Sequence, residues 1–101
     1  YNNYMNRYID LMDLWGFPSI DDQILALAKR LRLIRRVRGF SQAKFSDLSG
    51  IPLGTLKIFE RKGQISLKHL FQYAKALGLE SELNCLFREK EPTLEDMRNG
   101  K

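Results

Sequence analysis

The chain contains few of the residues that enzymes and metal-binding proteins use at their active sites. Among its 101 residues there is one cysteine, Cys85, and one histidine, His69. A single cysteine excludes an intrachain disulfide, and one cysteine with one histidine is too few for a zinc site built from this chain alone. No Ser–His–Asp or Cys–His pattern and no acidic cluster with metal-ligand spacing is visible. We therefore expect no enzyme activity, no metal and no cofactor, and we predict that Cys85 is a small buried side chain on a late helix.

Long apolar runs are also missing from the sequence. No stretch approaches the length that a helix needs to cross a bilayer, and no signal peptide is visible. These observations predict a cytoplasmic protein with no membrane partner. The sequence begins at Tyr1 rather than at methionine, which leaves open whether further residues precede it.

Positive charge, by contrast, is plentiful and unevenly distributed. The formal net charge is +5; basic residues crowd Lys29–Arg38 and recur through Lys44–Lys68, whereas acidic residues gather in Asp10–Asp22 and after Glu80. A basic centre with acidic flanks is typical of a nucleic-acid-binding face on a body of mixed charge. The charge alone is equally compatible with a solvated helix surface.

Periodic apolar residues predict helices along the chain and no strand. Because 44% of the 101 residues are hydrophobic, we expect one all-α domain with a small core. Serines before helices and glycines after them mark the boundaries. The expected helices are 3–15, 19–37, 41–49, 52–62, 66–77 and 80–88, and the phenylalanines expected in the core are Phe40, Phe45, Phe59, Phe71 and Phe87.

We divide the chain into three parts. Residues 1–18 are expected to form an N-terminal helical extension and residues 19–88 the main domain. Pro92 interrupts the helical pattern that precedes it. Residues 89–101 are therefore expected to form a flexible C-terminal tail, with one loose turn at Thr93–Met97.

The stretch Phe40–Gly63 predicts two short helices joined by a tight turn. Ser41 can cap the first helix and Gly50 supplies the turn. Pro52 lies at the start of the second helix, where its missing N–H costs little. This arrangement is typical of a helix-turn-helix, whose second helix fits the major groove of B-DNA. We therefore predict that the chain binds double-stranded DNA.

Residues 19–88 contain an ordered set of residues that can be matched to a known family. The set consists of Leu31 and Arg35, Ser41-Gln42, Gly50-Ile51-Pro52, Thr55-Leu56, Phe59-Glu60-Arg61 and Ser66-Leu67…Leu70…Ala74…Leu77-Gly78. It resembles the lambda-repressor/Cro (XRE) family of regulators. The resemblance implies a five-helix lambda-repressor-like DNA-binding domain, to which the extension adds an N-terminal helix. It also implies a transcriptional regulator that binds a palindromic operator as a homodimer.

The resemblance implies which side chains face DNA. Gln42 matches a position that contacts phosphate, although a glutamine that merely begins a helix is the alternative. Three of the four positions that normally face base edges lack polar side chains, so we expect contacts with thymine methyl groups and readout of DNA shape there. Lys57 and Arg61 are the expected polar readers, with Lys44 and Lys62 on the DNA backbone. The full set of implied DNA-binding residues is Gln42, Lys44, Leu53, Gly54, Thr55, Lys57, Ile58, Arg61 and Lys62.

The resemblance also implies an ion pair between Arg35 and Glu60. A planar guanidinium suits bidentate pairing with a carboxylate. We therefore predict that this pair fixes the angle at which the second helix of the helix-turn-helix is presented, and that Arg35 does not contact DNA. Removing one partner of a largely buried pair is expected to cost about 3–5 kcal/mol, because the other charge is left without a partner.

Two groups of apolar residues are candidates for contacts with a partner. The first lies on the last expected helix and suits a symmetric dimer contact, as is common in the family that the chain resembles; the second lies in the extension. Both groups are also compatible with ordinary packing within one chain. The candidates are Leu83, Leu86 and Phe87 on the helix, and Tyr8, Met12 and Trp15 in the extension.

A narrower resemblance involves the run GIPLGTLKIFERKGQISLKHLFQYAKALGLESELNCLF and the FREKEPTLEDM in which it ends. This region is similar to HipB-like antitoxins, which bind their own operator as dimers and hold a HipA-type kinase toxin in a repressive complex. The resemblance implies an antitoxin and autorepressor of a type II toxin–antitoxin operon, with a kinase toxin as partner. The alternatives are a stand-alone small phage-type repressor and a protein-interaction module that has lost DNA binding. The operator sequence, the role of the extension and the choice between repression and activation stay open.

Overall fold

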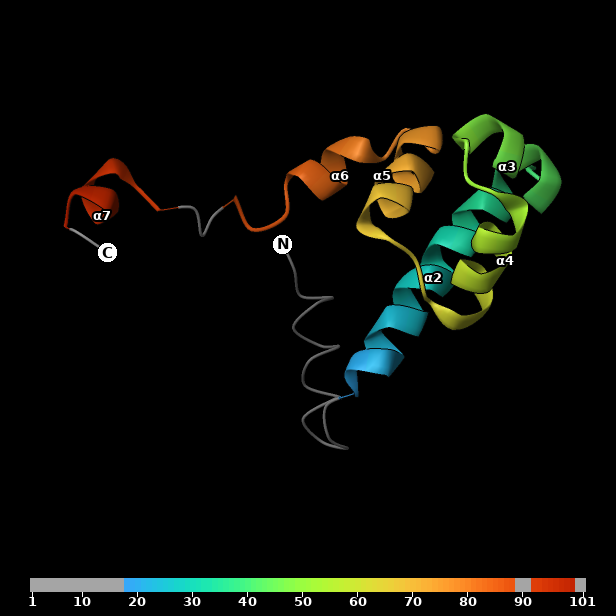
Figure 1. Cartoon of the computed structure of the whole chain (residues 1–101), viewed down its shortest axis with the longest axis horizontal. Coiled ribbons are helices and arrows are strands. Elements are labelled where there is room, and N and C mark those ends of the chain that lie inside the picture. The colour runs from blue at the N-terminus through green and yellow to red at the C-terminus, as the bar shows by residue number, and fades with distance from the viewer. Residues whose placement is uncertain (1–17, 89–91, 100–101) are drawn as a thin grey trace.

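Helices make up all the regular secondary structure in the part of the chain that the structure describes. The structure is a computed structural model, and it describes residues 18–88 and 92–99. Within these ranges the chain is all-α, with no strand (Figure 1). The helix expected over residues 3–15, with the candidate partner residues Tyr8, Met12 and Trp15, lies outside the described residues. The helices are α2 (Ile20–Val37), α3 (Gln42–Ser49), α4 (Leu53–Lys62), α5 (Leu67–Ala76), α6 (Glu80–Asn84) and α7 (Leu94–Arg98).

Serine side chains cap three of these helices, as the sequence predicts. The Ser19 hydroxyl accepts from the Asp22 N–H at 3.0 Å, and the Asp22 carboxylate accepts from the Ser19 N–H, which completes a capping box. Ser41 and Ser66 accept bonds from backbone N–H groups in the first turns of α3 and α5. These bonds satisfy N–H groups that have no partner within the helix, and so fix where each helix begins.

Two glycines set the path of the chain on either side of α4. Gly50 ends α3 with φ of 79°, and Gly63 ends α4 with φ of 80°. Both angles lie in the left-handed region, which residues with a Cβ rarely adopt. At Gly63 there is also no room for a side chain, since an added Cβ would lie 2.5 Å from Cγ2 of Ile24. The close approach of α2 and the end of α4 therefore requires glycine at this position.

The core lies where α2, α3, α4 and α5 converge. Aromatic rings fill its centre: the Tyr73 ring centroid lies 4.7 Å from that of Phe45 and 5.3 Å from that of Phe59. Tilted ring pairs at these distances add to the stabilisation that burial of the rings provides. The segment formed by α3 and α4 is thus held on two sides, with α3 against α5 and α4 against α2 (Figure 1). The buried hydrophobic residues are Ala28, Leu31, Phe45, Ile51, Leu56, Phe59, Tyr73, Ala74 and Leu77.

The region after α5 differs from the sequence prediction. The expected helix 80–88 ends at Asn84, and residues 85–87 form a turn. Because this turn leads away from the core, Cys85 is exposed, which contradicts the prediction that it is buried. Phe87 is 77% exposed, so its assignment to the core is also wrong. Among the other phenylalanines, Phe45 and Phe59 are buried, whereas Phe40 and Phe71 are half-buried.

The C-terminal segment contains more regular structure than the single loose turn expected there. Thr93 begins α7 with a capping box, in which its hydroxyl accepts from the Asp96 N–H and the Asp96 carboxylate accepts from the Thr93 N–H. The sequence Thr-Leu-Glu-Asp therefore supplies its own helix start. Leu94 and Met97 are exposed on this helix, which lies apart from the other helices in Figure 1. None of the helices described is both long and apolar enough to cross a membrane.

Candidate nucleic-acid interface

The α4 helix divides cleanly into an inward and an outward face. Leu56, Phe59 and Glu60 are buried on the inward face. Leu53 and Thr55 are half-buried at its edges. The exposed residues are Gly54, Lys57, Ile58, Arg61 and Lys62, which are all among the residues predicted to contact DNA.

Three of these exposed residues define the centre of the outward face. Gly54, Ile58 and Arg61 follow each other at intervals of four and three residues, and so they share one stripe of the helix. Lys57 and Lys62 lie on either side of that stripe. Apart from its chain neighbours and the backbone of its own helix, no heavy atom lies within 4 Å of the position that a Cβ on Gly54 would occupy. An approaching partner can therefore reach the α4 backbone at this point.

A buried ion pair fastens the inward face of α4 to α2. Arg35 donates from its Nε to Glu60 Oε2 at 2.7 Å and from its second terminal nitrogen to Glu60 Oε1 at 2.8 Å. The side chains are only 5% and 2% exposed, respectively. The remaining guanidinium nitrogen donates to the Phe40 carbonyl oxygen at 2.5 Å. The planar, two-point geometry leaves little freedom for α4 to rotate against α2.

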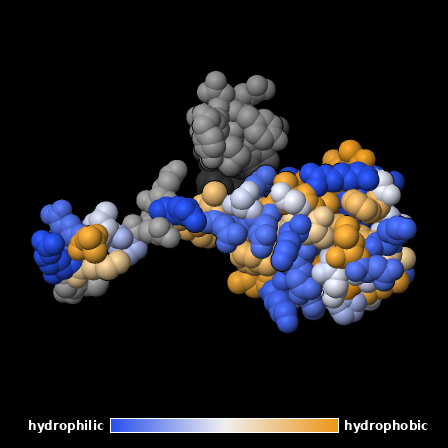
Figure 2. Space-filling model, turned by 90° about the horizontal axis from the view of Figure 1, so that it is seen from above, coloured by the Kyte–Doolittle hydropathy of each residue, from blue (hydrophilic) through white to orange (hydrophobic). Residues whose placement is uncertain are grey.

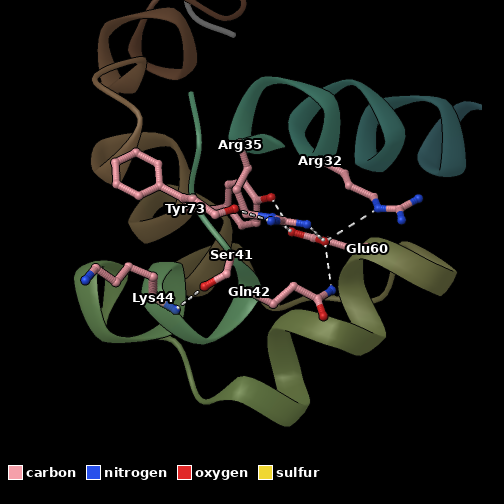
Figure 3. Close-up of polar contacts among 8 residues, drawn as sticks. Arg32, Arg35, Ser41, Gln42, Lys44, Glu60 and Tyr73 are labelled. Atoms are coloured by element: carbon pink, nitrogen blue, oxygen red, sulfur yellow. Dashed lines mark hydrogen bonds and ion pairs between the residues drawn. The ribbon is translucent and has the colours of Figure 1, made fainter. Parts of the chain in front are cut away.

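Other helices contribute further donors to the same carboxylate (Figure 3). The Tyr73 hydroxyl of α5 donates to Glu60 Oε2 at 2.6 Å, and Gln42 Nε2 of α3 donates to Oε1 at 3.0 Å. Arg32 Nε lies 3.9 Å from the same Oε1. One carboxylate on α4 is therefore held from α2, α3 and α5 together. A buried charge needs several partners of this kind to offset the loss of its hydration.

The ionisation of Glu60 reflects two opposing influences. Burial, the larger single influence, raises the pKa of Glu60, but hydrogen bonds from Arg35, Tyr73 and Gln42 together outweigh it and leave the pKa below its ordinary value of 4.5. The bond to Glu60 raises the pKa of Arg35. Burial, followed by the bond to Glu60, raises the pKa of Tyr73. At neutral pH the pair is therefore ionised and the tyrosine keeps its proton.

Two adjoining hollows bring cations from different helices to one surface. The first is lined by Lys57 and Arg61 of α4, Arg32 of α2 and Gln42 of α3, together with Glu60. The second shares Arg32 and Gln42 and continues along α2 and the start of α3. The residues that line this second hollow are Arg32, Arg35, Arg36, Gly39, Phe40, Ser41 and Gln42.

The predicted DNA-binding residues are not all alike in their surroundings. Gln42 lies at the hollow with Lys57 and Arg61, but its amide donates to Glu60, so its predicted contact with phosphate stays a prediction. Lys44 is exposed and extends away from the cluster around Glu60 (Figure 3). Lys62 lines a separate hollow with the beginning of α2. Across residues 18–88 and 92–99, the ion pairs involve only Arg32, Arg35 and Glu60, so the cations of α4 have no acidic partner there.

Arg32 and Arg36 belong to this surface although they are missing from the predicted DNA-binding residues. Both are exposed and lie four residues apart on α2, on the side that meets the start of α3. The signal that could have found them is their helical spacing, because residues four apart share a face. The basic stretch Lys29–Arg38 does not by itself indicate which of its members face α3 and α4, since that depends on how α2 packs against them.

The arrangement offers cations and hydrogen-bond donors that suit a polyanionic partner. Among the residues described, no group of three or more histidine, cysteine, aspartate or glutamate side chains could hold a metal ion. Hydrophobic and hydrophilic residues intermingle over the face shown in Figure 2. Comparison of the chain with models of protein families, with curated proteins and with solved structures found no match.

Proposed function

We propose that this protein is a sequence-specific DNA-binding transcriptional regulator of the lambda-repressor type. The observation that carries the proposal is the outward face of α4, whose exposed Lys57, Arg61 and Lys62 have no acidic partner within the part of the chain described here. On the opposite face, Glu60 locks this helix to three others. A rigidly presented helix with basic residues on its outer face suits insertion into the major groove of DNA.

In this proposal α3 and α4 form a helix-turn-helix with α4 as the recognition helix. The outward stripe of α4 faces base edges, while Lys44 and Lys62 contact phosphates on its two sides. Arg32 and Arg36 lengthen the basic surface along α2 and are proposed to face the DNA backbone as well. Backbone contacts fix the position of the protein on the duplex, and the contacts of α4 select the sequence.

We propose that two copies of the chain bind a palindromic operator, because one short recognition helix meets too little DNA for high specificity. Leu86 and Phe87 are the proposed contact, with Leu83 half-buried beside them. Phe87 has φ of 63°, the only positive value for a residue other than glycine in the described ranges. An exposed ring held in this costly conformation does little for the fold of its own chain, which favours a role in contact with a second copy.

We place the two-fold axis of this contact near Cys85, which is exposed and lies between Leu83 and Phe87 in the sequence. Glu82 of α6 and Arg88 after the turn give the surrounding patch both signs of charge. A symmetric interface uses the same patch on both copies, so a patch that carries both signs can pair with itself.

At a finer level we propose a HipB-like antitoxin that represses its own toxin–antitoxin operon and binds a HipA-type kinase toxin. The support is the sequence run already quoted, GIPLGTLKIFERKGQISLKHLFQYAKALGLESELNCLF. The proposal predicts that a kinase gene adjoins the gene for this chain and that the two proteins purify together. Unrelated neighbouring genes and no co-purifying kinase would leave a stand-alone phage-type repressor as the better description.

One observation favours a second function, that of a protein-interaction module. Ile58 is 40% exposed at the centre of α4, where many DNA-binding helices present polar side chains, and Gly54 beside it has no side chain at all. An apolar centre of this kind could equally meet a protein surface. The cations that surround this apolar centre favour DNA binding, and selection of bound sites separates the two functions.

The experiment is selection of bound sites from a library of random-sequence duplexes, using the full chain. The proposed regulator recovers a consensus of two inverted half-sites spaced by about one helical turn. A variant with Lys57→Ala and Arg61→Ala recovers a weaker or altered consensus, and Lys75→Ala on α5 serves as the control for loss of charge alone. Recovery of no consensus by the wild-type chain would favour the interaction module.

A further inference from the structure

The centre of the proposed DNA-facing stripe on α4 is apolar, which limits the bases that the protein can select. Ile58, in the second turn, is 40% exposed, with its aliphatic side chain on the outward face. Gly54, one turn earlier, contributes only backbone, with open space where a Cβ would lie. The polar residue on the same stripe, Arg61, is a further turn away near the C-terminal end of the helix.

The polar side chains nearest to Ile58 along the helix are Thr55, Lys57 and Arg61. Thr55 is half-buried, and Lys57 and Arg61 both line the hollow that they share with Arg32 and Gln42. The middle of the outward face therefore offers no group that could form a bidentate hydrogen bond with guanine or adenine. Any base edge that meets this point must be recognised by an apolar contact.

The major groove presents one apolar feature, the 5-methyl group of thymine. We propose that Ile58 is a specificity-determining residue that selects a thymine in each half-site through contact with this methyl group. The missing side chain at Gly54 lets the helix lie close enough to the bases for that contact. The inference rests on the proposed DNA-binding function and deepens it, because it states what the centre of the recognition helix selects.

The test begins with the consensus duplex recovered by the selection described above. Each thymine of one half-site is replaced in turn by deoxyuridine, which differs from thymine only by the missing methyl group. We expect one replacement to lower the affinity of the wild-type chain about three- to fivefold, the effect of removing one buried methyl-sized group. The other replacements are expected to have smaller effects.

The Ile58→Ala variant tests whether Ile58 is the group that contacts this methyl. This variant binds the thymine and deoxyuridine duplexes with equal affinity if the inference holds. Leu67→Ala is the matched control, since Leu67 is also an exposed aliphatic residue, 69% exposed at the start of α5. The control variant is expected to lose as much affinity as the wild type when the methyl group is removed. A second arm compares cytosine with 5-methylcytosine at the same position, where the wild-type chain is expected to gain about threefold from the methyl group.

The outcomes separate the inference from the function on which it rests. A consensus with no invariant thymine, or affinities that no deoxyuridine replacement changes, would overturn the inference while DNA binding stands. An equal loss on methyl removal in the wild type and in Ile58→Ala would also overturn it, because another residue would then be the reader. Absence of any salt-sensitive DNA binding would overturn the proposed function itself.

Discussion

At the scale of single residues, Glu60 is the side chain on which the presentation of α4 most depends. It is buried and charged, and it joins α4 to α2, α3 and α5 through Arg35, Gln42 and Tyr73. A network of this kind stabilises one arrangement of the helices only while every member has its partner. Glu60 therefore acts on function indirectly, by holding the outward face of α4 in place.

Removal of the Glu60 charge is predicted to destabilise the fold strongly. The Glu60→Gln substitution leaves Arg35 charged and buried without an ionised partner, and we expect it to lower the free energy of unfolding by about 3–5 kcal/mol. Urea denaturation followed by circular dichroism measures this change. Glu82→Gln on exposed α6 removes the same charge and is expected to change stability by no more than about 0.5 kcal/mol.

A double substitution gives the complementary result. Arg35→Met with Glu60→Leu replaces both charges by apolar side chains of similar size, so neither charge is left buried alone. We expect this variant to lose less stability than Glu60→Gln, as other buried ion pairs replaced in this way have done. An equal or greater loss in the double variant would contradict this expectation. It would mean that the ion pair, together with the bonds that Tyr73, Gln42 and Phe40 make to it, contributes net stability to the fold.

The depressed pKa of Glu60 predicts how stability depends on pH. Because the pKa of Glu60 is lower in the folded chain than its ordinary value of 4.5, its contribution to stability is complete above about pH 4.5. That contribution is lost as the pH falls below 4.5 and through the folded-state pKa. Urea denaturation between pH 7 and pH 2.5 measures this dependence. The double variant, which lacks Glu60, is expected to lose less stability over the acidic part of this range than the wild type does.

At the scale of the elements, the end of α4 depends on glycine for two separable reasons. Gly63 and Gly39 both have φ in the left-handed region, 80° and 87°. At Gly63 an added Cβ would meet Ile24 at 2.5 Å, whereas at Gly39 nothing lies within 4 Å. Gly39→Ala therefore measures the cost of backbone conformation, and Gly63→Ala adds the cost of the close contact with α2.

We predict that Gly39→Ala lowers the free energy of unfolding by about 1 kcal/mol and Gly63→Ala by about 2–4 kcal/mol. Thermal and urea denaturation of the two variants give the difference directly. Equal losses at the two positions would mean that Ile24 moves aside without cost, and that α2 and α4 are not held closely together at this end.

Much of the element order could be predicted from the sequence, because its signals are local. Ser19, Ser41 and Ser66 mark helix starts through hydrogen bonds within three residues, and the glycines after α3 and α4 mark helix ends through their backbone freedom. The start of α4 directly after Pro52 follows from the fixed φ of proline. Such signals depend little on the rest of the fold.

The prediction failed where the signals were not local. The apolar residues of 80–88 have helical spacing, but the helix ends at Asn84, and nothing near Cys85 in the sequence indicates that the chain turns away from the core there. The site shows the same limit. Tyr73 lies far from Glu60 in the sequence, so the sequence does not indicate that its hydroxyl donates a hydrogen bond to that carboxylate. Likewise, Arg32 lies at this surface only because α2 packs against α4.

At the scale of the whole molecule, the proposed dimer makes a prediction that the single cysteine can test. With Cys85 at the two-fold axis, mild oxidation of the DNA-bound protein is expected to join two copies covalently through their exposed Cys85 thiols. Non-reducing electrophoresis measures the product. Phe87→Ser is expected to weaken dimerisation and cross-linking together, whereas Leu67→Ser, at a comparably exposed apolar position, is the control. A stable dimer that never cross-links would contradict this register.

The whole basic surface, rather than any one side chain, determines the affinity for a polyanion. Arg32 and Arg36 of α2, Lys44 of α3 and Lys57 and Arg61 of α4 are all exposed, and they come from three helices that the core holds together. Neutralisation of phosphates by these groups releases counterions from the duplex, so the affinity must fall as the salt concentration rises.

The most direct test of DNA binding through α4 is the salt dependence of binding to the selected duplex. We predict that affinity falls about a thousandfold between 50 mM and 200 mM salt for the wild-type dimer. Lys62→Ala is expected to remove about two phosphate contacts, one from each copy, and so to reduce the slope of log affinity against log salt concentration by about two. Lys75→Ala is expected to leave this slope unchanged. Weak binding at 50 mM salt, or binding that does not respond to salt, would contradict the claim that the outward face of α4 is a DNA-binding surface.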